Sequence, residues 1–229
     1  MIRRSNVKAF WTALACAAAL AACAEPAQSD EPVRLTPAPR VDAASSSAPQ
    51  TAVLAGGCFW GLEGVFEHVR GVQRVRSGYA GGDARRANYE DVTSGETGHA
   101  EAVEIVFDPR VISYGEILRI YFSVATDPTQ LNRQGPDVGT QYRGAIFYAN
   151  AEQERVARAY VAQLTEARVF SRPIVTSIDA LPRFFPAEAY HQNYLWAHPR
   201  QPYIVHNDLP KIANLRRLFP DRYSAQRSG

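Results

Sequence analysis

A cysteine flanked by glycines and aromatic residues stands at residues 56–61, which read Gly-Gly-Cys-Phe-Trp-Gly, and this stretch limits the folds open to the chain. The two glycines permit a tight turn and a close approach of other groups to the backbone. Apolar residues then recur at helical spacing, at Phe59, Leu62, Phe66 and Val69. The pattern predicts a strand over residues 51–55 that turns into a helix at Cys58.

Two roles are possible for Cys58 at this position, a reactive thiol or a structural residue. A thiol at a helix N-terminus faces unpaired N–H groups and the positive end of the helix dipole, which favour thiolate and predict a lowered pKa. The following Phe59 and Trp60 can wall an apolar pocket beside the sulfur. The alternative is a buried structural cysteine before an amphipathic helix, because free cysteine is among the most buried residue types.

Residues 1–22 have the pattern of a secretory signal peptide of the lipoprotein type. Arg3, Arg4 and Lys8 precede an apolar run that is shorter than the roughly 20 residues needed to span a bilayer comfortably. The run ends in Leu-Ala-Ala-Cys, which resembles the lipobox of bacterial lipoproteins and predicts lipidation at Cys23. With Ala24 after it, we expect export and anchoring to the outer membrane, facing the periplasm of a Gram-negative bacterium. The alternative is an ordinary signal peptide cut at one of the alanines.

The next segment predicts a tether rather than a domain. After Cys23, the chain to residue 50 is rich in Ala, Pro and Ser, so it lacks the apolar surface that would offset its ordering entropy. We therefore expect a lipidated cysteine with a disordered tether over residues 23–50. A catalytic domain over 51–223 and a disordered tail over 224–229 complete the predicted organisation.

Composition narrows the chemistry further. The chain has three cysteines; Cys16 leaves with the signal and Cys23 carries lipid, so Cys58 becomes the free thiol of the mature protein. An exported protein normally pairs its cysteines, and here no intramolecular disulfide is possible. The formal net charge is +2. Three of the cations lie in the signal peptide, so the mature chain has no basic stripe, and we expect no nucleic-acid partner. The scattered histidines give no metal-ligand spacing, so no metal is expected.

Glu101 begins a second informative stretch. Alternation of period two places Glu101 with Val103, Ile105 and Phe107 on one face of a strand. A carboxyl group that heads an apolar row has its charged form disfavoured, so its pKa rises and it becomes a proton donor near neutral pH. The alternative is an exposed carboxylate at the end of an edge strand, because Glu is seldom fully buried.

The remaining pattern predicts an α+β chain. Further strands are expected at residues 72–79 and 143–148 and around 174–178, and helices at 114–124, 151–169, within 186–196 and around 211–218, with a long polar loop at 127–143. Close flanking of several strands requires antiparallel pairing. The prediction is a two-layer sandwich with a mixed or antiparallel sheet and a long irregular C-terminal segment.

Three stretches together carry a family resemblance. Residues 57–61, 98–101 (Gly-His-Ala-Glu) and 127–143, in this order and spacing, resemble the peptide-methionine (S)-S-oxide reductases. The resemblance covers about residues 51–205 and implies a ferredoxin-like core. It also implies reduction of the S epimer of methionine sulfoxide in exported proteins, through a sulfenic acid on Cys58.

The resemblance also implies a role for each site residue. Cys58 resembles the nucleophile and Glu101 the acid that protonates or hydrogen-bonds the sulfoxide oxygen. Tyr89 and Tyr142 resemble the hydroxyls that hold this oxygen. The substrate-binding residues are Phe59 and Trp60, which resemble the walls around the methyl group, and Asp137, which resembles the loop carboxylate that orders the site.

The sequence departs from the family in one respect. Many members carry resolving cysteines near the C-terminus, whereas here Ile204 follows Tyr203 at that place and residues 224–229 contain none. We therefore expect no bound cofactor and an external reductant, which is a thioredoxin-like, glutaredoxin-like or small thiol.

Three other functions remain open at this point. A cysteine hydrolase would need His99 or His191 as its base, although these histidines have a structural or surface role as their alternative. A thiol peroxidase would share the sulfenic acid without needing the aromatic pair. A lipoprotein scaffold without catalytic activity would not need Cys58.

Overall fold

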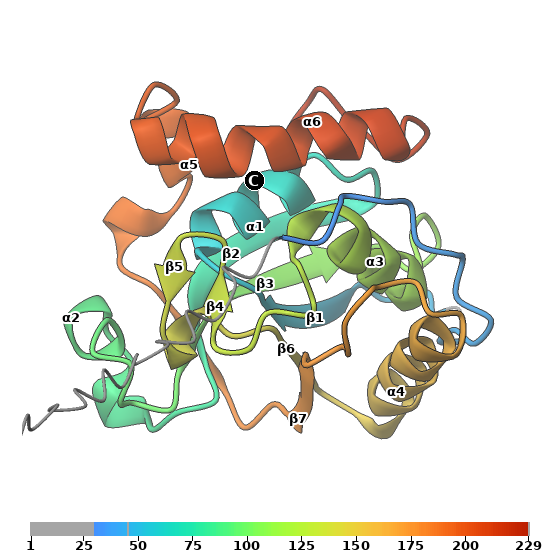
Figure 1. The fold of residues 1–229 in the computed structure, drawn as a ribbon, viewed down its shortest axis with the longest axis horizontal. Helices are drawn as coiled ribbons and strands as arrows, with labels where there is room; N and C mark the ends of the chain where they lie inside the picture. Colours follow the sequence, from blue (N-terminus) through green and yellow to red (C-terminus); the bar gives the residue numbers. More distant parts are fainter. Residues whose placement is uncertain (1–29, 45, 229) are drawn as a thin grey trace, which may run out of the picture.

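The computed structural model describes residues 30–44 and 46–228 (Figure 1). The predicted signal peptide over residues 1–22 and the lipidation at Cys23 lie outside these residues. The helices are α1 Phe59–Glu67, α2 Tyr89–Val92, α3 Tyr114–Ile120, α4 Ala151–Glu166, α5 Tyr194–Ala197 and α6 Leu209–Leu218. The strands are β1 Gln50–Ala55, β2 Val72–Ala80, β3 Ala100–Phe107, β4 Arg133–Gln134, β5 Asp137–Val138, β6 Ala145–Tyr148, β7 Ser177–Ala180 and β8 Phe184–Pro186.

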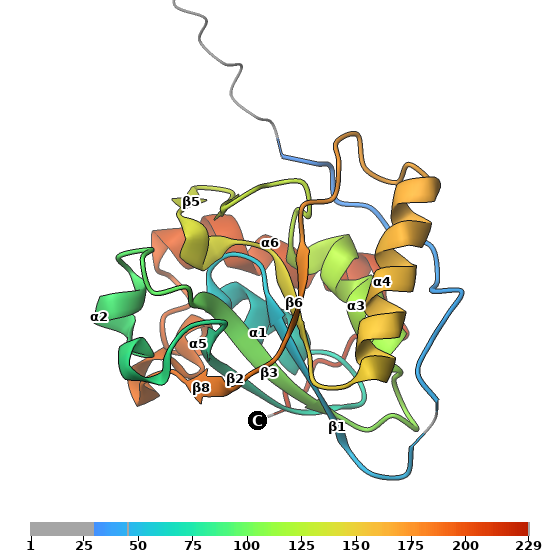
Figure 2. The ribbon, with the colours of Figure 1, turned by 90° about the horizontal axis from the view of Figure 1, so that it is seen from below.

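Six of the described strands form one sheet in the order β7-β6-β1-β3-β2-β8 (Figure 2). The strands β6, β1, β3 and β2 are antiparallel to one another, and β8 pairs with β2 in the same way, whereas β7 runs parallel to β6. Strand β3 lies between β1 and β2, so β1-α1-β2 is a split β-α-β unit, which is the ferredoxin-like arrangement. The predicted α+β fold with a mixed sheet is confirmed.

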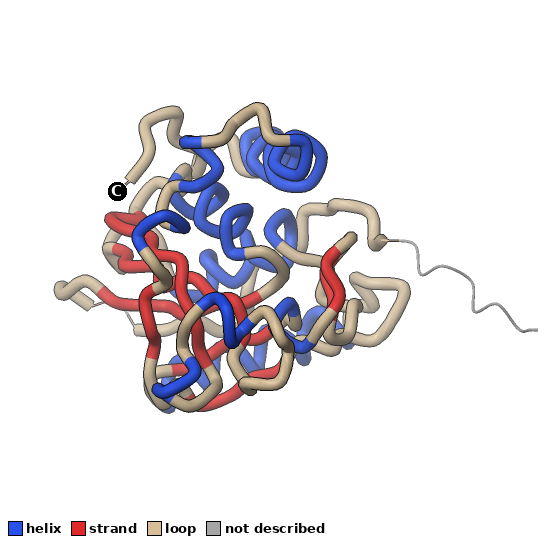
Figure 3. The backbone as a smooth tube through the Cα atoms, turned by 90° about the vertical axis from the view of Figure 1, so that its left-hand side faces the viewer, coloured by secondary structure: helices blue, strands red, loops and turns tan. Residues whose placement is uncertain are grey.

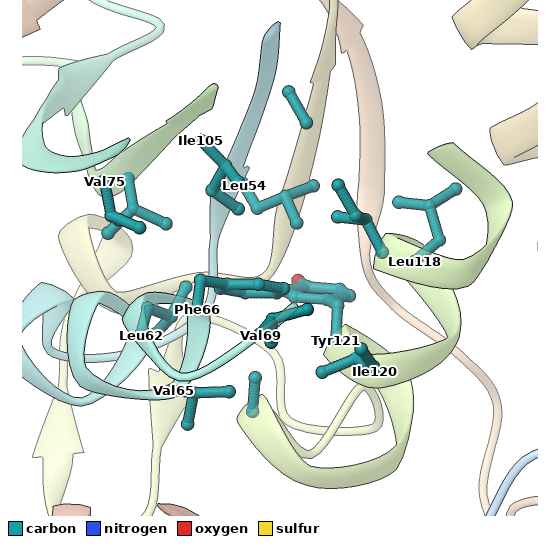
Figure 4. Packing of buried hydrophobic residues seen from close by; sticks show 14 of the residues in the cluster. Leu54, Leu62, Val65, Phe66, Val69, Val75, Ile105, Leu118, Ile120 and Tyr121 are labelled. Carbon is teal, nitrogen blue, oxygen red and sulfur yellow. The ribbon is translucent and has the colours of Figure 1, made fainter. Parts of the chain in front are cut away.

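The main core lies between the sheet and helices α1 and α3. Leu54 and Ile105 project from β1 and β3 toward Phe66 of α1, and all three side chains are fully buried (Figure 4). Period two on β3 and a spacing of three to four residues on α1 place these apolar groups on facing surfaces. Each large apolar side chain buried in this way contributes roughly 1.5–3 kcal/mol. The core therefore fixes the end of β1 against the start of α1, where Cys58 lies.

Helix α6 adds a layer outside α1 (Figure 1; Figure 3 shows most helices on one side of the strands). Its Leu215 is fully buried, and a side chain on Gly64 of α1 would meet Ile212 of α6 and Leu195 of α5. The helices expected within residues 186–196 and around residues 211–218 are present as α5 and α6. Burial of one apolar face against α1 stabilises these helices.

The predicted disorder of residues 224–229 is wrong for residues 224–228. The backbone N–H of Ser224 donates to the His68 carbonyl and that of Ser228 to the Glu67 carbonyl. These carbonyls lie at the end of α1, where a helix leaves acceptors without an internal partner. Arg227 adds an ion pair with the buried carboxylate of Glu67 at 3.4 Å.

Residues 30–44, here called the N-terminal strap, lie along the domain instead of forming the predicted disordered tether. Thr36 is fully buried, and its hydroxyl hydrogen-bonds with Ser123 Oγ and Tyr160 OH, each at 2.8 Å. Asp42 accepts from the Gly115 backbone N–H at 2.8 Å, at the positive N-terminus of α3. The tether prediction is wrong for these residues because polar contacts, which no apolar periodicity reveals, hold the strap.

Two smaller differences concern element ends. Helix α3 stops at Ile120 and continues as a wider π-type turn over Tyr121–Ala125, and β7 lies at Ser177–Ala180, slightly later than expected. Ser113 is the N-cap of α3, since its side chain accepts from the Glu116 backbone N–H. In the part of the chain that the structure describes, no helix has the length and apolar character that a membrane crossing requires.

Candidate active site

The turn before Cys58 is shaped by two close contacts. Gly57 has φ +93°, in the left-handed region that favours glycine, and its N–H donates to the Tyr142 carbonyl at 3.2 Å. A Cβ at this position would lie 2.7 Å from Cγ of Gln134. Tyr121 donates to the carbonyl of Ala55, the last residue of β1, at 2.6 Å. The backbone is thus held where Cys58 becomes the N-cap of α1.

The structure brings every residue predicted at the active site into one cavity of about 190 Å³. This cavity, here called the sulfoxide cavity, is lined by Cys58, Phe59, Trp60, Tyr89, Glu101, Asp137, Tyr142 and Tyr203. The residues come from α1, α2, β3, β5 and the turns that precede β6 and α6. A thiol, a carboxyl group, hydroxyl groups and aromatic walls therefore converge on one small space.

Glu101 lies near the start of β3 and is only 3% exposed. Burial, the largest effect, and the negative charges of Asp137 and Asp208 together raise its pKa to about 8, against the lowering effect of a hydrogen bond from the Phe59 backbone N–H at 3.0 Å. At neutral pH the carboxyl group is mostly protonated. The prediction of a raised pKa is confirmed, and the alternative of an exposed carboxylate is wrong.

The pKa prediction for Cys58 is wrong. The side chain is 7% exposed, and burial raises its pKa well above the ordinary value, with further increases from the charges of Glu101 and Asp208. A hydrogen bond from the Trp60 backbone N–H lowers it, as expected at a helix N-terminus, but does not offset desolvation. The resting group is therefore a thiol.

Trp60 forms a fixed wall of the sulfoxide cavity. Its ring stacks on Tyr194 at a centroid distance of 3.9 Å and an interplanar angle of 12°, and its Nε1 donates to Nδ1 of His191 at 3.2 Å. The Tyr203 ring meets it edge-on at 6.2 Å, and Phe59 lies beside it at 6.3 Å. These contacts hold an apolar surface next to Cys58 before any substrate arrives.

The polar groups of the cavity are held in place by hydrogen bonds. The backbone N–H of Tyr89 donates to Glu188 at 2.9 Å, and Asp137 accepts a hydrogen bond from the Tyr203 hydroxyl. Burial raises the pKa of Tyr89 and of Tyr142, so both phenols remain protonated and can donate hydrogen bonds.

Sequence reasoning missed two residues beside the cysteine. Tyr203 lines the cavity. The one sequence feature that could have indicated it is its position before Ile204, where many members of the family carry a resolving cysteine. Asp208 is fully buried with no hydrogen-bond partner for either carboxylate oxygen among the described residues. Its pKa is raised to about 6 by burial, against the opposing charge of Lys211. No local pattern marks Asp208, because the contact between the segment before α6 and α1 is tertiary.

The two histidines considered as a hydrolase base, His99 and His191, support the scaffold. His99 Nδ1 accepts from the Gly82 N–H at 3.2 Å, and its Nε2 contacts the Asp83 carbonyl at 2.9 Å. His191 holds Trp60 and does not line the cavity. A cysteine hydrolase would lack its base here. Across residues 30–44 and 46–228, no three His, Cys, Asp or Glu side chains gather as a metal site.

The chain is similar to characterised proteins over most of its length. Residues 50–223 match the family described as Peptide methionine sulfoxide reductase. Peptide methionine sulfoxide reductase MsrA 2 of Mesorhizobium japonicum is 54% identical over 184 residues, which cover 80% of this chain and 94% of the relative. The MsrA of Deinococcus radiodurans is 50% identical over 176 residues, covering 77% and 85%.

Solved structures agree with these sequence relationships. Reduced Mxr1 of Saccharomyces cerevisiae superposes with a TM-score of 0.61 at 29% identity, covering 71% of this chain and 92% of that chain. Methionine sulfoxide reductase A of Corynebacterium diphtheriae has a TM-score of 0.58 at 34% identity, covering 67% and 76%. Since the family match spans most of the residues, this chain belongs to the peptide methionine sulfoxide reductase family.

Proposed function

We propose that this methionine sulfoxide reductase acts on the S epimer in proteins and works through a sulfenic acid on Cys58. The observation that supports the proposal is the convergence of the Cys58 thiol and the protonated Glu101 carboxyl group on one cavity with aromatic walls. Sulfoxide sulfur is a poor electrophile until its oxygen gains a proton. A nucleophile that attacks the sulfur therefore needs a neutral acid beside the sulfoxide oxygen.

The first step in this scheme is binding and activation of the sulfoxide. The methyl group packs on Phe59 and Trp60, and the oxygen accepts hydrogen bonds from the tyrosine hydroxyls and from protonated Glu101. Because Glu101 keeps its proton up to a pH of about 8, it can transfer that proton as the S–O bond polarises. Preorganised donors aimed at the oxygen stabilise the charge that develops there.

The second step transfers the oxygen. The Cys58 sulfur attacks the substrate sulfur, and the thiol proton passes to Glu101, which has given its own proton to the sulfoxide oxygen. Collapse of the adduct then gives methionine and a Cys58 sulfenic acid, so the protons balance. The raised pKa of Cys58 keeps the sulfur as a thiol until a sulfoxide is bound. A thiol peroxidase needs a thiolate at rest, so this environment disfavours the peroxidase alternative.

Regeneration requires two reducing thiols from outside the chain. The first forms a mixed disulfide with Cys58 and releases water, and the second displaces Cys58 as a thiol. Cys58 is a free cysteine, and residues 59–229 contain no further cysteine to take the first role. The proposed reductant is a thioredoxin-like, glutaredoxin-like or small thiol.

We also propose that the protein is exported and anchored by lipid at Cys23. The support is the sequence pattern of residues 1–23. Mass spectrometry of the protein from a membrane fraction tests this directly. The proposal requires an N-terminal Cys23 carrying acyl groups, and a soluble product that begins at another residue contradicts it.

The decisive experiment for the activity is turnover of each separated sulfoxide epimer with dithiothreitol. Wild type should consume the S epimer and leave the R epimer, Cys58→Ser should be inactive, and Glu101→Gln should bind substrate with most of the rate lost. Equal consumption of both epimers contradicts the stereochemical proposal. Turnover by Cys58→Ser contradicts the nucleophile.

A further inference from the structure

Cys58 lies in the walls of two cavities. The sulfoxide cavity holds about 190 Å³, and a second cavity of about 260 Å³ reaches the same residue. The second is bounded by the N-terminal strap, by Phe122 and Phe170, and by Lys211 and Asn214 of α6. We call it the strap cavity. Its lining includes Val33, which is 45% exposed, so it borders the protein surface.

The two cavities have different chemistry. They share Cys58, Asp137 and Tyr203, whereas Glu101, both other tyrosines and the aromatic walls line only the sulfoxide cavity. The Tyr203 hydroxyl donates to Asp137, so the residues shared with Cys58 form a hydrogen-bonded pair. Glu101, the acid that handles oxygen, does not line the strap cavity.

Displacement at a divalent sulfur proceeds in line, with the incoming nucleophile opposite the leaving group. In the proposed reaction the oxygen moves to Cys58 from a substrate held against Glu101. The S–O bond of the sulfenic acid then points into the sulfoxide cavity. A resolving thiol must approach the sulfur from outside the sulfoxide cavity, and the strap cavity is a second space that Cys58 lines.

We propose that the strap cavity is the binding site of a low-molecular-weight thiol that resolves the Cys58 sulfenic acid. This inference rests on the proposed function. The thiol sulfur bonds to Cys58 as the S–O bond breaks, and the hydroxyl leaves as water with a proton from Glu101, which the thiol proton replaces. A second thiol then attacks the mixed disulfide, giving the Cys58 thiol and a small disulfide, so the two thiols supply both electrons.

The size and charge of the strap cavity suit this ligand. It is larger than the cavity that must accept a methionine sulfoxide side chain, so a thiol of similar length fits. Its lining includes the cations Arg34 and Lys211 and four carboxylates, those of Asp30, Glu31, Asp127 and Asp137, so it suits a thiol without negative charge better than an anionic one.

The test separates oxygen transfer from resolution. Asn214→Trp fills the strap cavity from α6, and Ala213→Trp is the matched control because Ala213 is exposed on the same helix and does not line the cavity. Each protein is oxidised with one equivalent of sulfoxide and then mixed with dithiothreitol. Return of the Cys58 thiol is followed by quenching with an alkylating agent and mass spectrometry.

We expect Asn214→Trp to form methionine in a single turnover like wild type, while its rate constant for reduction by dithiothreitol falls at least about tenfold. Ala213→Trp should match wild type in both steps. Val33→Trp narrows the cavity from the strap and serves as a second blocking variant if Asn214→Trp does not fold. Resolution at the wild-type rate in the folded blocking variants overturns the strap-cavity route. Failure of wild type to form methionine overturns the proposed function instead.

Discussion

Glu101 Oε2 accepts a hydrogen bond from the backbone N–H of Phe59 at 3.0 Å, across 42 positions of sequence. This bond joins the start of β3 to the first residue of α1, directly after Cys58. The acid and the nucleophile are therefore positioned by one contact between two core elements.

Replacing Glu101 by Gln should lower kcat about 10²–10⁴-fold with little change in KM. The amide oxygen can still accept from Phe59, so the loop geometry is kept, but the proton donor is lost. Steady-state kinetics with dithiothreitol, together with thermal unfolding to confirm folding, provides the measurement. A rate near that of wild type would remove Glu101 from the mechanism.

Stability should depend on pH through the same carboxyl group. Its pKa is about 8 in the folded protein against an ordinary value of 4.5, so its contribution is fully present below pH 4.5 and is lost as pH rises through 8. The loss is on the order of 5 kcal/mol, because one pKa unit corresponds to about 1.4 kcal/mol.

Urea unfolding at pH 5, 7 and 9 measures this dependence. Wild type should lose stability over this range relative to Glu101→Gln, which cannot ionise at the position. Glu63, whose pKa is also raised to about 8 by burial, is present in both proteins and cancels in the difference. Parallel curves for the two proteins would show that Glu101 is not protonated in the folded state.

Gly61 should be intolerant of even a methyl group. A Cβ at this position would lie 2.2 Å from Oδ1 of Asp208, which is itself fully buried. Gly61→Ala should therefore destabilise the protein by about 1–3 kcal/mol despite the better helix propensity of Ala. In a double-mutant cycle with Asp208→Ala, much of this cost should disappear, because the clashing carboxylate is gone. Additive costs would contradict the contact.

The strap can be tested at Thr36. Thr36→Val keeps the shape but removes its hydrogen bonds to Ser123 and Tyr160 in a buried site, so we expect a loss of about 1–3 kcal/mol. Leu35→Ala is the control, because Leu35 is 48% exposed and its replacement should cost less than about 0.5 kcal/mol. Equal and small effects of both substitutions would support the tether that the sequence predicted.

Local periodicity explains which parts of the site were predictable. Cys58 and Glu101 stand at points where helical and alternating patterns begin, so their placement and the burial of Glu101 could be inferred from neighbours in sequence. The ferredoxin-like topology and the convergence of Tyr89, Tyr142 and Asp137 were implied only by the family resemblance.

The remaining features depend on contacts between distant segments. The pKa of Cys58 was misjudged because the helix N-terminus is local, whereas desolvation and the charge of Asp208 arise from tertiary packing. The strap and residues 224–228 lack apolar periodicity and are held by hydrogen bonds to backbone and side-chain groups elsewhere in the domain. Tyr203 likewise reaches the site through tertiary packing of a segment distant in sequence from Cys58.

A single turnover without reductant tests whether Cys58 takes the oxygen of the sulfoxide. Enzyme is mixed with an excess of a peptide containing the S epimer of methionine sulfoxide, then treated with dimedone, and the products are counted. We expect one methionine for each enzyme molecule and one dimedone adduct, located on Cys58. Methionine formation by Cys58→Ser, or a wild-type turnover that leaves Cys58 unmodified, would rule out Cys58 as the oxygen acceptor.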